Sequence, residues 1–534
     1  TIVRWDYPQP NIAALQAEDA QIDNKGQAPW RFGYNNYTNI STANTGTWLE
    51  LPNGARLWFV RVKCDAALTV NLTFEQTVIP EGNQLFVYNT QKDFILGAFT
   101  QQHIYDGQLG TELIPGEEAI VEYYVAPKNE IGHIQLGTVT HGYRTANEFM
   151  EKAFGSSGAC NMNVNCPDGL PWTPQRNSAI MLVSGSSGFC SGALINNTQN
   201  DGKPYVLTAN HCYSNPANWI FRFNWQSESC SNPGTSPSFQ SLSGAVLRSR
   251  RTPSDFCLVE ITGGLVNGTV PLVYNPFFAG WDNSGTIPTR TVCIHHPSGD
   301  IKKIAFDDNP ATISQAMGSS EPNSTWTVQW DRNTTTEGGS SGSPLFDQSG
   351  RIIGQLWGGG ASCMNLSAPD YYGRVLSSWE PAGSNSTNQL KHWLDPLNSG
   401  AAFIDGFDPT NSTSLALDAA LSGASIVEQA VCADNYLPSV SLLNVGSTTL
   451  TSALIEYQID NGPVQQLNWS GSLAQWQVQV IALPMVQLAT GSHTFTATVS
   501  NPNQALDENA TNNQSIYSMN ITAVPETIDL LKVT

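Results

Sequence analysis

The sequence predicts a mainly β protein built from several domains, and three observations carry this prediction. The chain has 534 residues, and at roughly 150 residues per domain that length suggests three or four domains. Apolar and polar residues alternate along many short segments, which is the pattern of strands with one buried face. The 45 glycines and 31 prolines supply frequent turn signals between those segments.

The first block, residues 1–148, is predicted to be an antiparallel β-sandwich. Its clearest strand alternates apolar with polar residues, at Leu68, Val70, Leu72 and Phe74, which is the signature of a half-buried strand. Similar β-rich runs follow, at QLFVY (84–88), AIVEYYV (119–125) and HIQLGTV (133–139). No stretch of this block shows a sustained helical period, so we expect no helix in it.

The second block, residues 155–408, holds most of the cysteines and motifs. It closes with NQLKHWLDP (388–396), where Leu390, Trp393 and Leu394 follow helical spacing and Pro396 stops the turn. A single terminal helix after a long β-rich stretch predicts a β-barrel domain rather than an α/β domain.

The third block, residues 414–524, is predicted to be an Ig-like β-sandwich, followed by a tail at 525–534. Apolar residues alternate into a turn at Asp460-Asn461-Gly462, and strand patterns follow at Trp476–Val480 and in HTFTATV (493–499). The acidic and amide residues at 507–513 lack the ligand spacing and turn glycine of a calcium loop. We therefore expect a polar loop there, and no metal site or cofactor in the chain.

The charge balance excludes several classes of function. The chain has 24 Lys+Arg and 44 Asp+Glu, a net charge of −20, so nucleic-acid phosphates and anionic lipids would repel it. No apolar run approaches the ~18 residues of a membrane-spanning helix. The chain begins at Thr1 without a methionine, which suggests that a signal peptide has been removed or the chain trimmed.

The ten cysteines indicate an oxidising compartment. No CxxC pair occurs, so zinc-ribbon and thioredoxin-like sites are excluded. Eight of the ten lie in the segment from Cys160 to Cys363, a density typical of disulfides in secreted proteins. We therefore expect an extracellular protein, and attachment to a cell surface through the C-terminal region stays open.

Ser341 is the candidate nucleophile. The triplet GSS occurs four times, but only the last copy lies in GGSSGSPLFDQSGRIIGQLWGGG (338–360), a Gly-rich bend between hydrophobic strands. Small residues on both sides of Ser341 allow a substrate carbonyl to approach its Oγ. They also allow the amides of Gly339 and Ser341 to point together at a developing oxyanion.

A nucleophilic serine needs a base, and His211 is the candidate among eight histidines. It ends the apolar strand PYVLTANHC (204–212), and the upstream GFCSGAL (188–194) suggests a disulfide that clamps its loop. Asp255 in SDFCLVEI (254–261) is the acid that would orient it. Taken singly, His211 would be a structural histidine and Asp255 a capping or turn aspartate.

Together, TANHC (208–212), SDFCLVEI and GSSGSP (339–344) resemble the chymotrypsin-like serine proteases, in the chain order His, Asp, Ser. Across 155–408 the sequence is more similar to the bacterial lysyl endopeptidases. This resemblance is carried by ACNMNVNCP (159–167), CSGALINNT (190–198), CIHHPSGDIKKI (293–304), EGGSSGSPLF (337–346), GQLWGGGASC (354–363), DYYGRV (370–375) and LDPLNSGAAFIDG (394–406).

The resemblance implies a chymotrypsin-like double β-barrel for the second block. It also implies that His211 is the general base, that Asp255 orients it, and that Ser341 attacks the peptide carbonyl. Gly339 and Ser341 would form the oxyanion hole.

The resemblance further implies a disulfide framework, with the pairs Cys160–Cys363, Cys166–Cys230 and Cys190–Cys212. Cys257 and Cys293 are additional to it. Both lie in predicted core strands, where they could pair or remain two buried thiols.

The sequence departs from the family's pattern around the substrate cleft. Trp357 stands in GQLWGG where the family usually has a histidine, and Met317 lies near the place of a frequent tryptophan. Both positions would flank the substrate cleft, so we expect the rate and the pH profile to differ from those of relatives. Trp357 and Gly358 are predicted to bind the substrate. Ser340 stands where vertebrate trypsins carry an aspartate that pairs with a freed N-terminus, so that activation switch is unavailable.

The resemblance also implies cleavage after lysine. Asp370 heads DYYGRV, where the family places its lysine-binding aspartate. A pocket for a cation must supply a fixed negative charge, because a buried unpaired ammonium is costly. The alternative is a strand-edge aspartate paired with Arg374. A preference for lysine over arginine follows from the family likeness alone.

The outer blocks resemble known regions less specifically. Residues 1–148, including THGYR (140–144), resemble the region that precedes the protease in lysyl endopeptidase precursors. A lysine-specific enzyme could cut itself after Lys152 and free this block as a propeptide, and the alternative is a plain interdomain linker. The third block looks like the adhesion-type Ig-like modules of secreted bacterial enzymes.

Two rivals to a protease acting on proteins or peptides stay open. Gly338 to Gly342 also spells the GxSxG of α/β-hydrolases, but that fold needs Asp and then His after the serine, and only His392 and His493 follow. The non-enzyme rival is a surface-binding protein with an inert protease domain, supported by the two flanking β domains and by Trp357.

Overall fold

The computed structural model describes residues 2–22, 28–144, 157–184, 188–266, 268–383, 385–410, 415–428, 435–475 and 477–521. The described chain is mainly β, so the predicted fold class is confirmed. The chain divides into two compact units, one of residues 1–198 and 202–410 and one of residues 199–201 and 411–534. Lys152 and the tail at 525–534 lie outside the described residues, and the three-block division stays a prediction.

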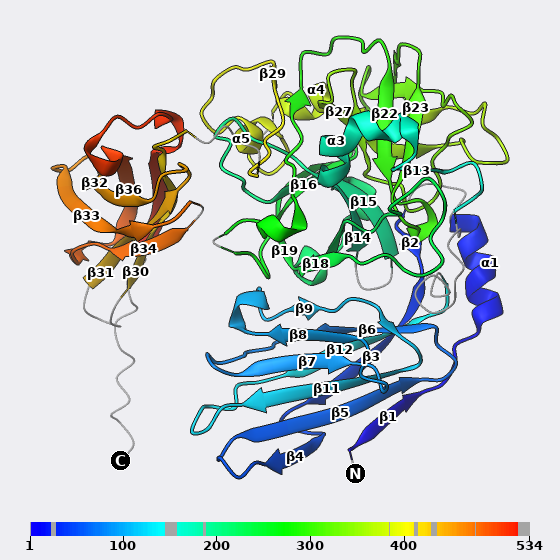
Figure 1. The fold of residues 1–534 in the computed structure, drawn as a ribbon, viewed down its shortest axis with the longest axis horizontal. Helices are drawn as coiled ribbons and strands as arrows, with labels where there is room; N and C mark the ends of the chain where they lie inside the picture. The colour runs from blue at the N-terminus through cyan, green and yellow to red at the C-terminus, as the bar shows by residue number, and fades with distance from the viewer. Residues whose placement is uncertain are drawn as a thin grey trace, which may run out of the picture. The chain divides into compact units, whose positions relative to one another are not determined.

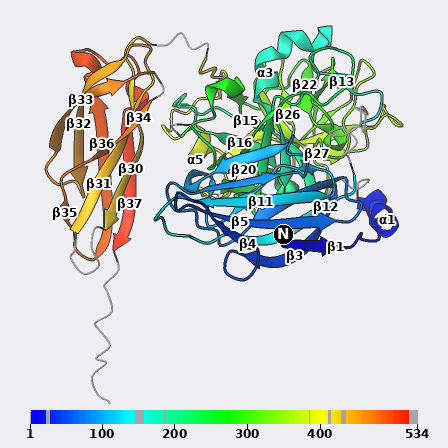
Figure 2. The ribbon, with the colours of Figure 1, turned by 60° about the horizontal axis from the view of Figure 1, so that its bottom comes forward.

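The described part of the first block is a β-sandwich (Figures 1 and 2). One sheet has the order β1-β5-β11-β7-β8, with β4 beside β5. Its strands are β1 (Arg4–Tyr7), β4 (Thr47–Glu50), β5 (Arg56–Cys64), β7 (Gln84–Tyr88), β8 (Ile95–Phe99) and β11 (Glu118–Val125). The facing sheet has the order β10-β6-β12-β3, with β9 beside β6. Its strands are β3 (Gly33–Ser41), β6 (Thr69–Phe74), β9 (Leu109–Gly110), β10 (Ile114–Pro115) and β12 (Gln135–Gly142).

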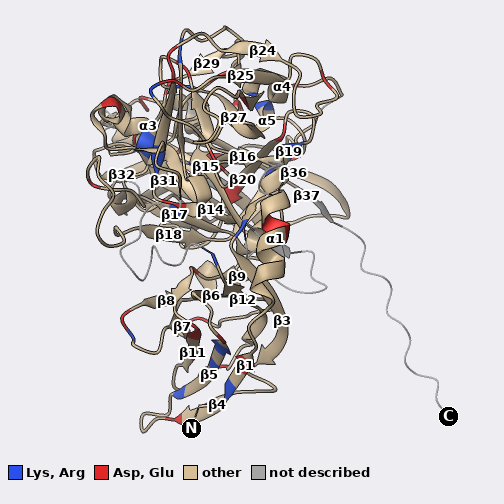
Figure 3. Ribbon diagram, turned by 90° about the vertical axis from the view of Figure 1, so that its right-hand side faces the viewer, with Lys and Arg blue, Asp and Glu red and all other residues tan. Residues whose placement is uncertain are grey.

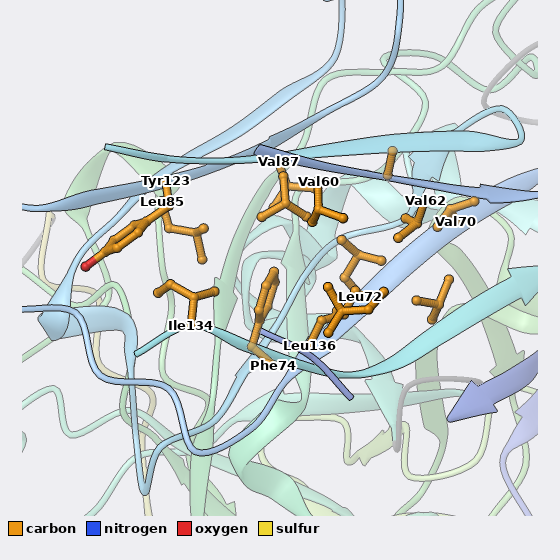
Figure 4. Close-up of a cluster of buried hydrophobic side chains, with 14 of the residues drawn as sticks. Val60, Val62, Val70, Leu72, Phe74, Leu85, Val87, Tyr123, Ile134 and Leu136 are labelled. Atoms are coloured by element: carbon orange, nitrogen blue, oxygen red, sulfur yellow. The ribbon is translucent and has the colours of Figure 1, made fainter. Parts of the chain in front are cut away.

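Apolar side chains of the two sheets meet in one core, part of which Figure 4 shows. Val60 and Tyr123 from one sheet and Leu72 and Leu136 from the other are all completely buried. The residues between the apolar positions of β6 are buried as well, namely Thr69, Asn71 and Thr73. The prediction of a half-buried strand is therefore wrong for β6. Its neighbour β9 touches the second block, since a Cβ on Gly110 would lie 2.1 Å from the Asn218 carbonyl oxygen.

Two further predictions for the first block are wrong. The block contains a helix, α1 (Ile12–Ile22), with the sequence IAALQAEDAQI. It is rich in alanine and other strong helix formers but lacks an apolar stripe, so it gives no periodic signal. The sandwich is also not wholly antiparallel, because β1 pairs with β5 in parallel.

The described part of the second block is built on two sheets. The first, called the β27 sheet, has the order β13-β23-β22-β26-β27-β28-β25-β24, with β21 beside β27 and β29. Its strands are β13 (Met162–Asn163), β21 (Trp281–Asp282), β22 (Thr291–His295), β23 (Lys303–Asp307), β24 (Thr312–Ser314), β25 (Thr325–Val328), β26 (Pro344–Phe346), β27 (Ile352–Gly359), β28 (Asp370–Arg374) and β29 (Phe403–Ile404).

The second, called the β15 sheet, has the order β18-β17-β14-β15-β16-β20-β19, and β2 of the first block pairs with β15. Its strands are β2 (Trp30–Arg31), β14 (Ala179–Ser184), β15 (Gly188–Leu194), β16 (Tyr205–Ala209), β17 (Ile220–Phe223), β18 (Gln240–Ser243), β19 (Ala245–Arg251) and β20 (Phe256–Ile261). One hydrophobic cluster takes residues from both sheets, among them Leu207 and Phe346.

The terminal helix of the second block is present as α5 (Lys391–Leu394), but it is not alone. Two other short helices, α3 (Thr173–Ser178) and α4 (Val375–Trp379), also lie in this block. Each is too short to display helical periodicity in the sequence, so the prediction of a single helix is wrong.

The third block lies in the second unit and forms a sandwich of its own. One sheet has the order β30-β31-β34 with β35 beside β31, and the other has the order β33-β32-β36-β37. The strands are β30 (Ala419–Glu428), β31 (Asn435–Asn444), β32 (Leu450–Ile459), β33 (Gln465–Leu473), β34 (Val478–Ala482), β35 (Val486–Gln487), β36 (Gly491–Ser500) and β37 (Gln514–Ile521). Asp460 and Asn461 have φ of 51° and 57°, as a tight hairpin turn requires.

Charged side chains are sparse, and most of the ribbon in Figure 3 is therefore tan. The polar loop at 507–513 is hydrogen-bonded to the start of β30, since Asp507 Oδ2 accepts a hydrogen bond from the Ala419 amide at 3.1 Å. Within the described residues, no helix has the length and apolar character needed to cross a membrane.

Candidate active site

The loop that carries Ser341 bridges the two sheets of the second block. The Ser191 amide of β15 donates to the Ser341 carbonyl at 2.8 Å, and the Gly342 amide donates to the Leu356 carbonyl of β27 at 2.9 Å. Gly342 has φ of 82°, and a Cβ there would lie 2.1 Å from Thr208 Oγ1, so only glycine fits. This packing holds Ser341 against the end of β16, which leads directly to His211.

His211 lies in the 3₁₀ turn η4 (Asn210–Cys212) and faces Asp255. Its Nδ1 is 2.8 Å from Asp255 Oδ2, and its backbone amide donates to Asp255 Oδ1 at 3.0 Å. The other ring nitrogen, Nε2, is buried and has no hydrogen-bond partner. The structure thus brings the predicted base and acid together and leaves Nε2 free to accept a proton.

Asp255 is 2% exposed and adopts φ of 50° immediately before β20. Burial raises the pKa of its carboxyl, and the facing His211 imidazole acts against that rise. A buried carboxylate needs hydrogen-bond or charge partners. The ring Nδ1 and the backbone amide of His211 are two such partners. The orientation of the imidazole is therefore fixed by Asp255.

The amides of Gly339 and Ser341 are available for an oxyanion. Gly339 has φ of 89°, and its carbonyl oxygen accepts a hydrogen bond from Ser191 Oγ at 3.0 Å. Neither amide donates to any group in the described part of the chain. Two free, fixed N–H groups beside a serine are the arrangement that stabilises charge on a carbonyl oxygen.

Ser340 is held by a histidine that the sequence analysis missed. His295 Nδ1 lies 2.7 Å from Ser340 Oγ, and the Glu337 amide donates to the same oxygen at 3.2 Å. Burial lowers the pKa of His295 to about 3, so the imidazole is neutral at ordinary pH. In the sequence His295 had no signal that separated it from the packing histidines.

Asp370, the predicted cation-binding residue, is buried at the start of β28. Its Oδ2 accepts hydrogen bonds from Trp330 Nε1 at 2.7 Å and Thr336 Oγ1 at 2.6 Å. Its Oδ1 accepts a single 3.3 Å bond from the Ala361 amide. Burial raises the pKa of this carboxyl. All three donors are neutral, so none of them supplies a positive charge to balance an ionised Asp370.

The alternative partner for Asp370, Arg374, lies elsewhere. Its guanidinium donates to the Asn323 carbonyl at 2.8 Å and stacks on the Trp326 ring at 4.3 Å. The predicted alternative of a strand-edge Asp370–Arg374 pair is therefore wrong. A β-strand rises about 3.3 Å per residue, so side chains four residues apart in β28 cannot meet.

Trp357 and Gly358 lie in β27, opposite the start of β28. The pairing between these strands shifts register between Leu356 and Gly358, which places Trp357 at a bulge. Trp357 is 8% exposed. Gly359 follows and allows Asp370 to approach, since a Cβ there would lie 2.1 Å from Asp370 Oδ1.

The described residues contain the three disulfides that the resemblance implied, Cys160–Cys363, Cys166–Cys230 and Cys190–Cys212. The last ties β15 to the turn that carries His211. Cys257 and Cys293 are free and buried, so they do not pair, and Cys64 is a third buried thiol. Cys432 lies outside the described residues. Glu337 lies near Cys160 and Cys363, but these sulfurs bond each other and do not offer a metal site.

In the second block the Ser341 loop thus lies between the two sheets, beside the end of the strand that leads to the His211–Asp255 pair. Residues 154–373 match the family model described as "Lysyl endopeptidase, C-terminal domain". The lysyl endopeptidase of Pseudomonas aeruginosa is 24% identical over 276 residues, which are 47% of this chain and 57% of that protein. The chain thus spans little more than half the length of this relative.

Solved structures also resemble part of the chain. Kallikrein-related peptidase 10 matches 38% of this chain and 90% of its own, at 17% identity and a TM-score of 0.27. An inactive mutant of Rv3671c from Mycobacterium tuberculosis matches 38% of this chain and 83% of its own, at 16% identity and a TM-score of 0.25. At these scores neither likeness bears on function.

Proposed function

We propose that the second block is a secreted serine endopeptidase that cleaves proteins or peptides after lysine, through an acyl-enzyme on Ser341. The observation that carries this proposal is the His211–Asp255 pair beside the Ser341 loop, with the Gly339 and Ser341 amides free. The family match at 154–373 supports the same reaction class. Attachment of the enzyme to a cell surface through the third block stays a prediction.

In the proposed reaction His211 carries the proton in both the acylation and the deacylation step. Nε2 of His211 takes the proton of Ser341 Oγ as the oxygen bonds the peptide carbonyl carbon. The amides of Gly339 and Ser341 bind the oxyanion of that intermediate. Imidazolium then gives its proton to the leaving amine, and water attacks the acyl-enzyme by the reverse sequence of proton transfers. Asp255 holds Nδ1–H and stabilises the imidazolium.

The proposed preference for lysine rests on Asp370. Its Oδ1 accepts only one long hydrogen bond, and each carboxylate oxygen has two lone pairs. A lysine ammonium reaching this oxygen would compensate a buried charge that neutral donors now hold. Gly359 and Gly358 keep the neighbouring strand free of side chains that would fill the approach.

The test of this function is labelling with a fluorophosphonate probe together with hydrolysis of lysine peptides. Ser341→Ala should abolish labelling and lower kcat by roughly 10⁶. Ser343→Ala is the matched control, because Ser343 lies in the same loop, is also buried and contacts Cys293 instead. Normal turnover in Ser341→Ala, or no labelling of the wild-type chain, would refute the proposal.

A further inference from the structure

The Ser341 loop separates two walls of the site. The Leu356 carbonyl and Asp370 belong to the β27 sheet, whereas Ser191, which binds the Ser341 carbonyl, belongs to β15. Suppose that a peptide places its lysine at Asp370 and the carbonyl of that lysine at Ser341. Its residues up to the scissile bond then lie along the β27 sheet. Its residues after the scissile bond must then leave along the other wall, past β15.

The beginning of β15 is already paired with another segment of the same chain. Gly188 pairs with Arg31 and Phe189 with Trp30, both antiparallel, while β16 pairs only with Ala193 and Leu194. The short strand β2, labelled in Figure 1, therefore occupies the edge of β15 two residues before Ser191, whose amide binds the Ser341 carbonyl. Addition of an extended peptide to a sheet edge is a common way for proteins to bind peptides.

The Trp30 side chain extends this contact to the serine loop itself. Its ring stacks near Phe189, with centroids 6.0 Å apart and planes 11° from parallel. A Cβ on Gly338 would lie 2.6 Å from Trp30 Cδ1, so the indole touches the backbone of the residue before Gly339. Trp30 is 9% exposed. A peptide that leaves along β15 would meet this indole.

The segment is held in place by charged residues of the first block. Asp19 of α1, itself 3% exposed, pairs with Arg31 at 2.7 Å and with Arg144 at 2.9 Å. The Arg144 guanidinium lies 3.8 Å from the Trp30 ring centroid. Because buried charge pairs and cation–π contacts fix geometry, β2 is a positioned strand rather than a loose loop.

The first block also contacts the second block through residues outside β2. Arg222 of β17 and Glu112 form a bidentate pair at 3.1 and 2.5 Å, with side chains 0% and 2% exposed. Apolar residues of both blocks share one cluster, among them Phe32, Leu113 and Val183. A buried ion pair and a shared core therefore hold the first block against the second.

From these contacts we infer that the first block is a built-in inhibitor of the proposed protease, with Trp30–Arg31 filling the place of the substrate residues that follow the scissile bond. The inference rests on the proposed function. Being part of the same chain, β2 competes at an effective concentration in the millimolar range. Substrates with only a small group after the scissile bond need not displace it, whereas longer peptides must.

The experiment compares two substrates with identical residues up to the lysine. One carries a small chromogenic leaving group and the other carries four residues after the bond, and both are assayed on the full chain. Trp30→Ala should raise kcat/KM for the longer peptide by about tenfold, since a buried tryptophan is a dominant contact. For the small substrate, kcat/KM should change by less than about twofold. Trp48→Ala, on β4 and 37% exposed, is the matched control.

Fluorophosphonate labelling of Ser341 separates the two proposals. Normal labelling with an unchanged ratio between the two substrates in Trp30→Ala would overturn this inference alone. Absence of labelling in wild type and variants would overturn the proposed function and this inference with it. Should Trp30→Ala fail to fold, Arg144→Ala loosens the indole while leaving both sheets intact, and the same increase is expected from it.

Discussion

Asp255 and Asp370 are two carboxylates of the second block buried to the same degree, at 2% and 1% exposure, but with different surroundings. Asp255, before β20, faces the imidazole of His211 at 2.8 Å. Asp370, at the start of β28, is bound by an indole N–H, a hydroxyl and a backbone amide. Burial raises the pKa of both.

The difference shows what each carboxylate can do. A titratable partner inside the protein allows Asp255 to hold a histidine and to stabilise its protonated form during a reaction. Neutral donors keep Asp370 in place but leave its charge uncompensated, so its best partner is a cation brought by a ligand. One site is completed within the chain, and the other is completed by the substrate.

Of the substitutions at these two carboxylates, Asp255→Asn should lower activity the most. The amide keeps the shape of the side chain but no longer favours Nδ1–H and the imidazolium, so kcat should fall about 10⁴-fold for every substrate. Steady-state kinetics on one lysine and one uncharged substrate measures this. A loss confined to lysine substrates would contradict the role of Asp255.

Asp370→Asn should give a smaller and selective effect. Removing one partner of a buried charge pair costs several kcal/mol, so kcat/KM for lysine substrates should fall about 100- to 1,000-fold. Fluorophosphonate labelling of Ser341 should remain near the wild-type rate. Normal cleavage after lysine in this variant would place the pocket charge elsewhere.

The same variant should not be less stable. Because burial raises the pKa of Asp370, its carboxyl favours the folded state in protonated form, and that stability is lost as pH rises through the folded pKa. Asparagine stays neutral, so at pH 7 the melting temperature of Asp370→Asn should equal or exceed that of wild type, measured by calorimetry. A fall of several degrees would show that the carboxylate charge supports the fold.

Acidification provides a third test. An alkylammonium ligand binds only the ionised carboxylate, so its affinity should fall as pH drops, by up to about tenfold per unit below the pKa of Asp370. The raised pKa places the onset above the ordinary aspartate value of about 3.9. Calorimetric titration of n-butylammonium into the Ser341→Ala chain between pH 4 and 8 measures this, with Asp370→Asn as the control. An affinity independent of pH would disagree with the assignment.

Local patterns in the sequence predicted much of this architecture. Alternating residues indicated β7, β11 and β32, and the turn at Asp460-Asn461 follows from residues that tolerate positive φ. The sequence predicted His211 and Asp255 as candidates because His211 follows one apolar strand and Asp255 precedes another. Their pairing requires only that β16 and β20 be neighbours, as they are.

Contacts between distant segments could not be predicted in this way. The two-residue strand β2 has no periodicity, and it exists because β15 offers an edge and Asp19 holds Arg31. Trp330 and Thr336 likewise gave no signal as donors to Asp370. Helix α1 escaped notice because its alanines favour a helix without marking a buried face.

His295 offers a third arrangement of a buried polar group, and the smallest expected effect. Its pKa of about 3 keeps it neutral, so its hydrogen bond to Ser340 supports the turn of Gly339 without any charge. Ser340→Ala removes the partner of His295 and the acceptor of the Glu337 amide. We expect kcat to fall about tenfold with little change in KM, because the oxyanion donors act mainly in the transition state.

Because His295 is neutral throughout, the ratio of wild-type to Ser340→Ala kcat should be the same at pH 6 and pH 9. A ratio that changes with pH would mean that a charged pair, as in vertebrate trypsins, shapes this turn. Ser343→Ala serves as the control within the same loop, since its hydroxyl contacts Cys293 and not the turn at Gly339. An equal fall of kcat in both variants would reduce the role of His295 to general packing.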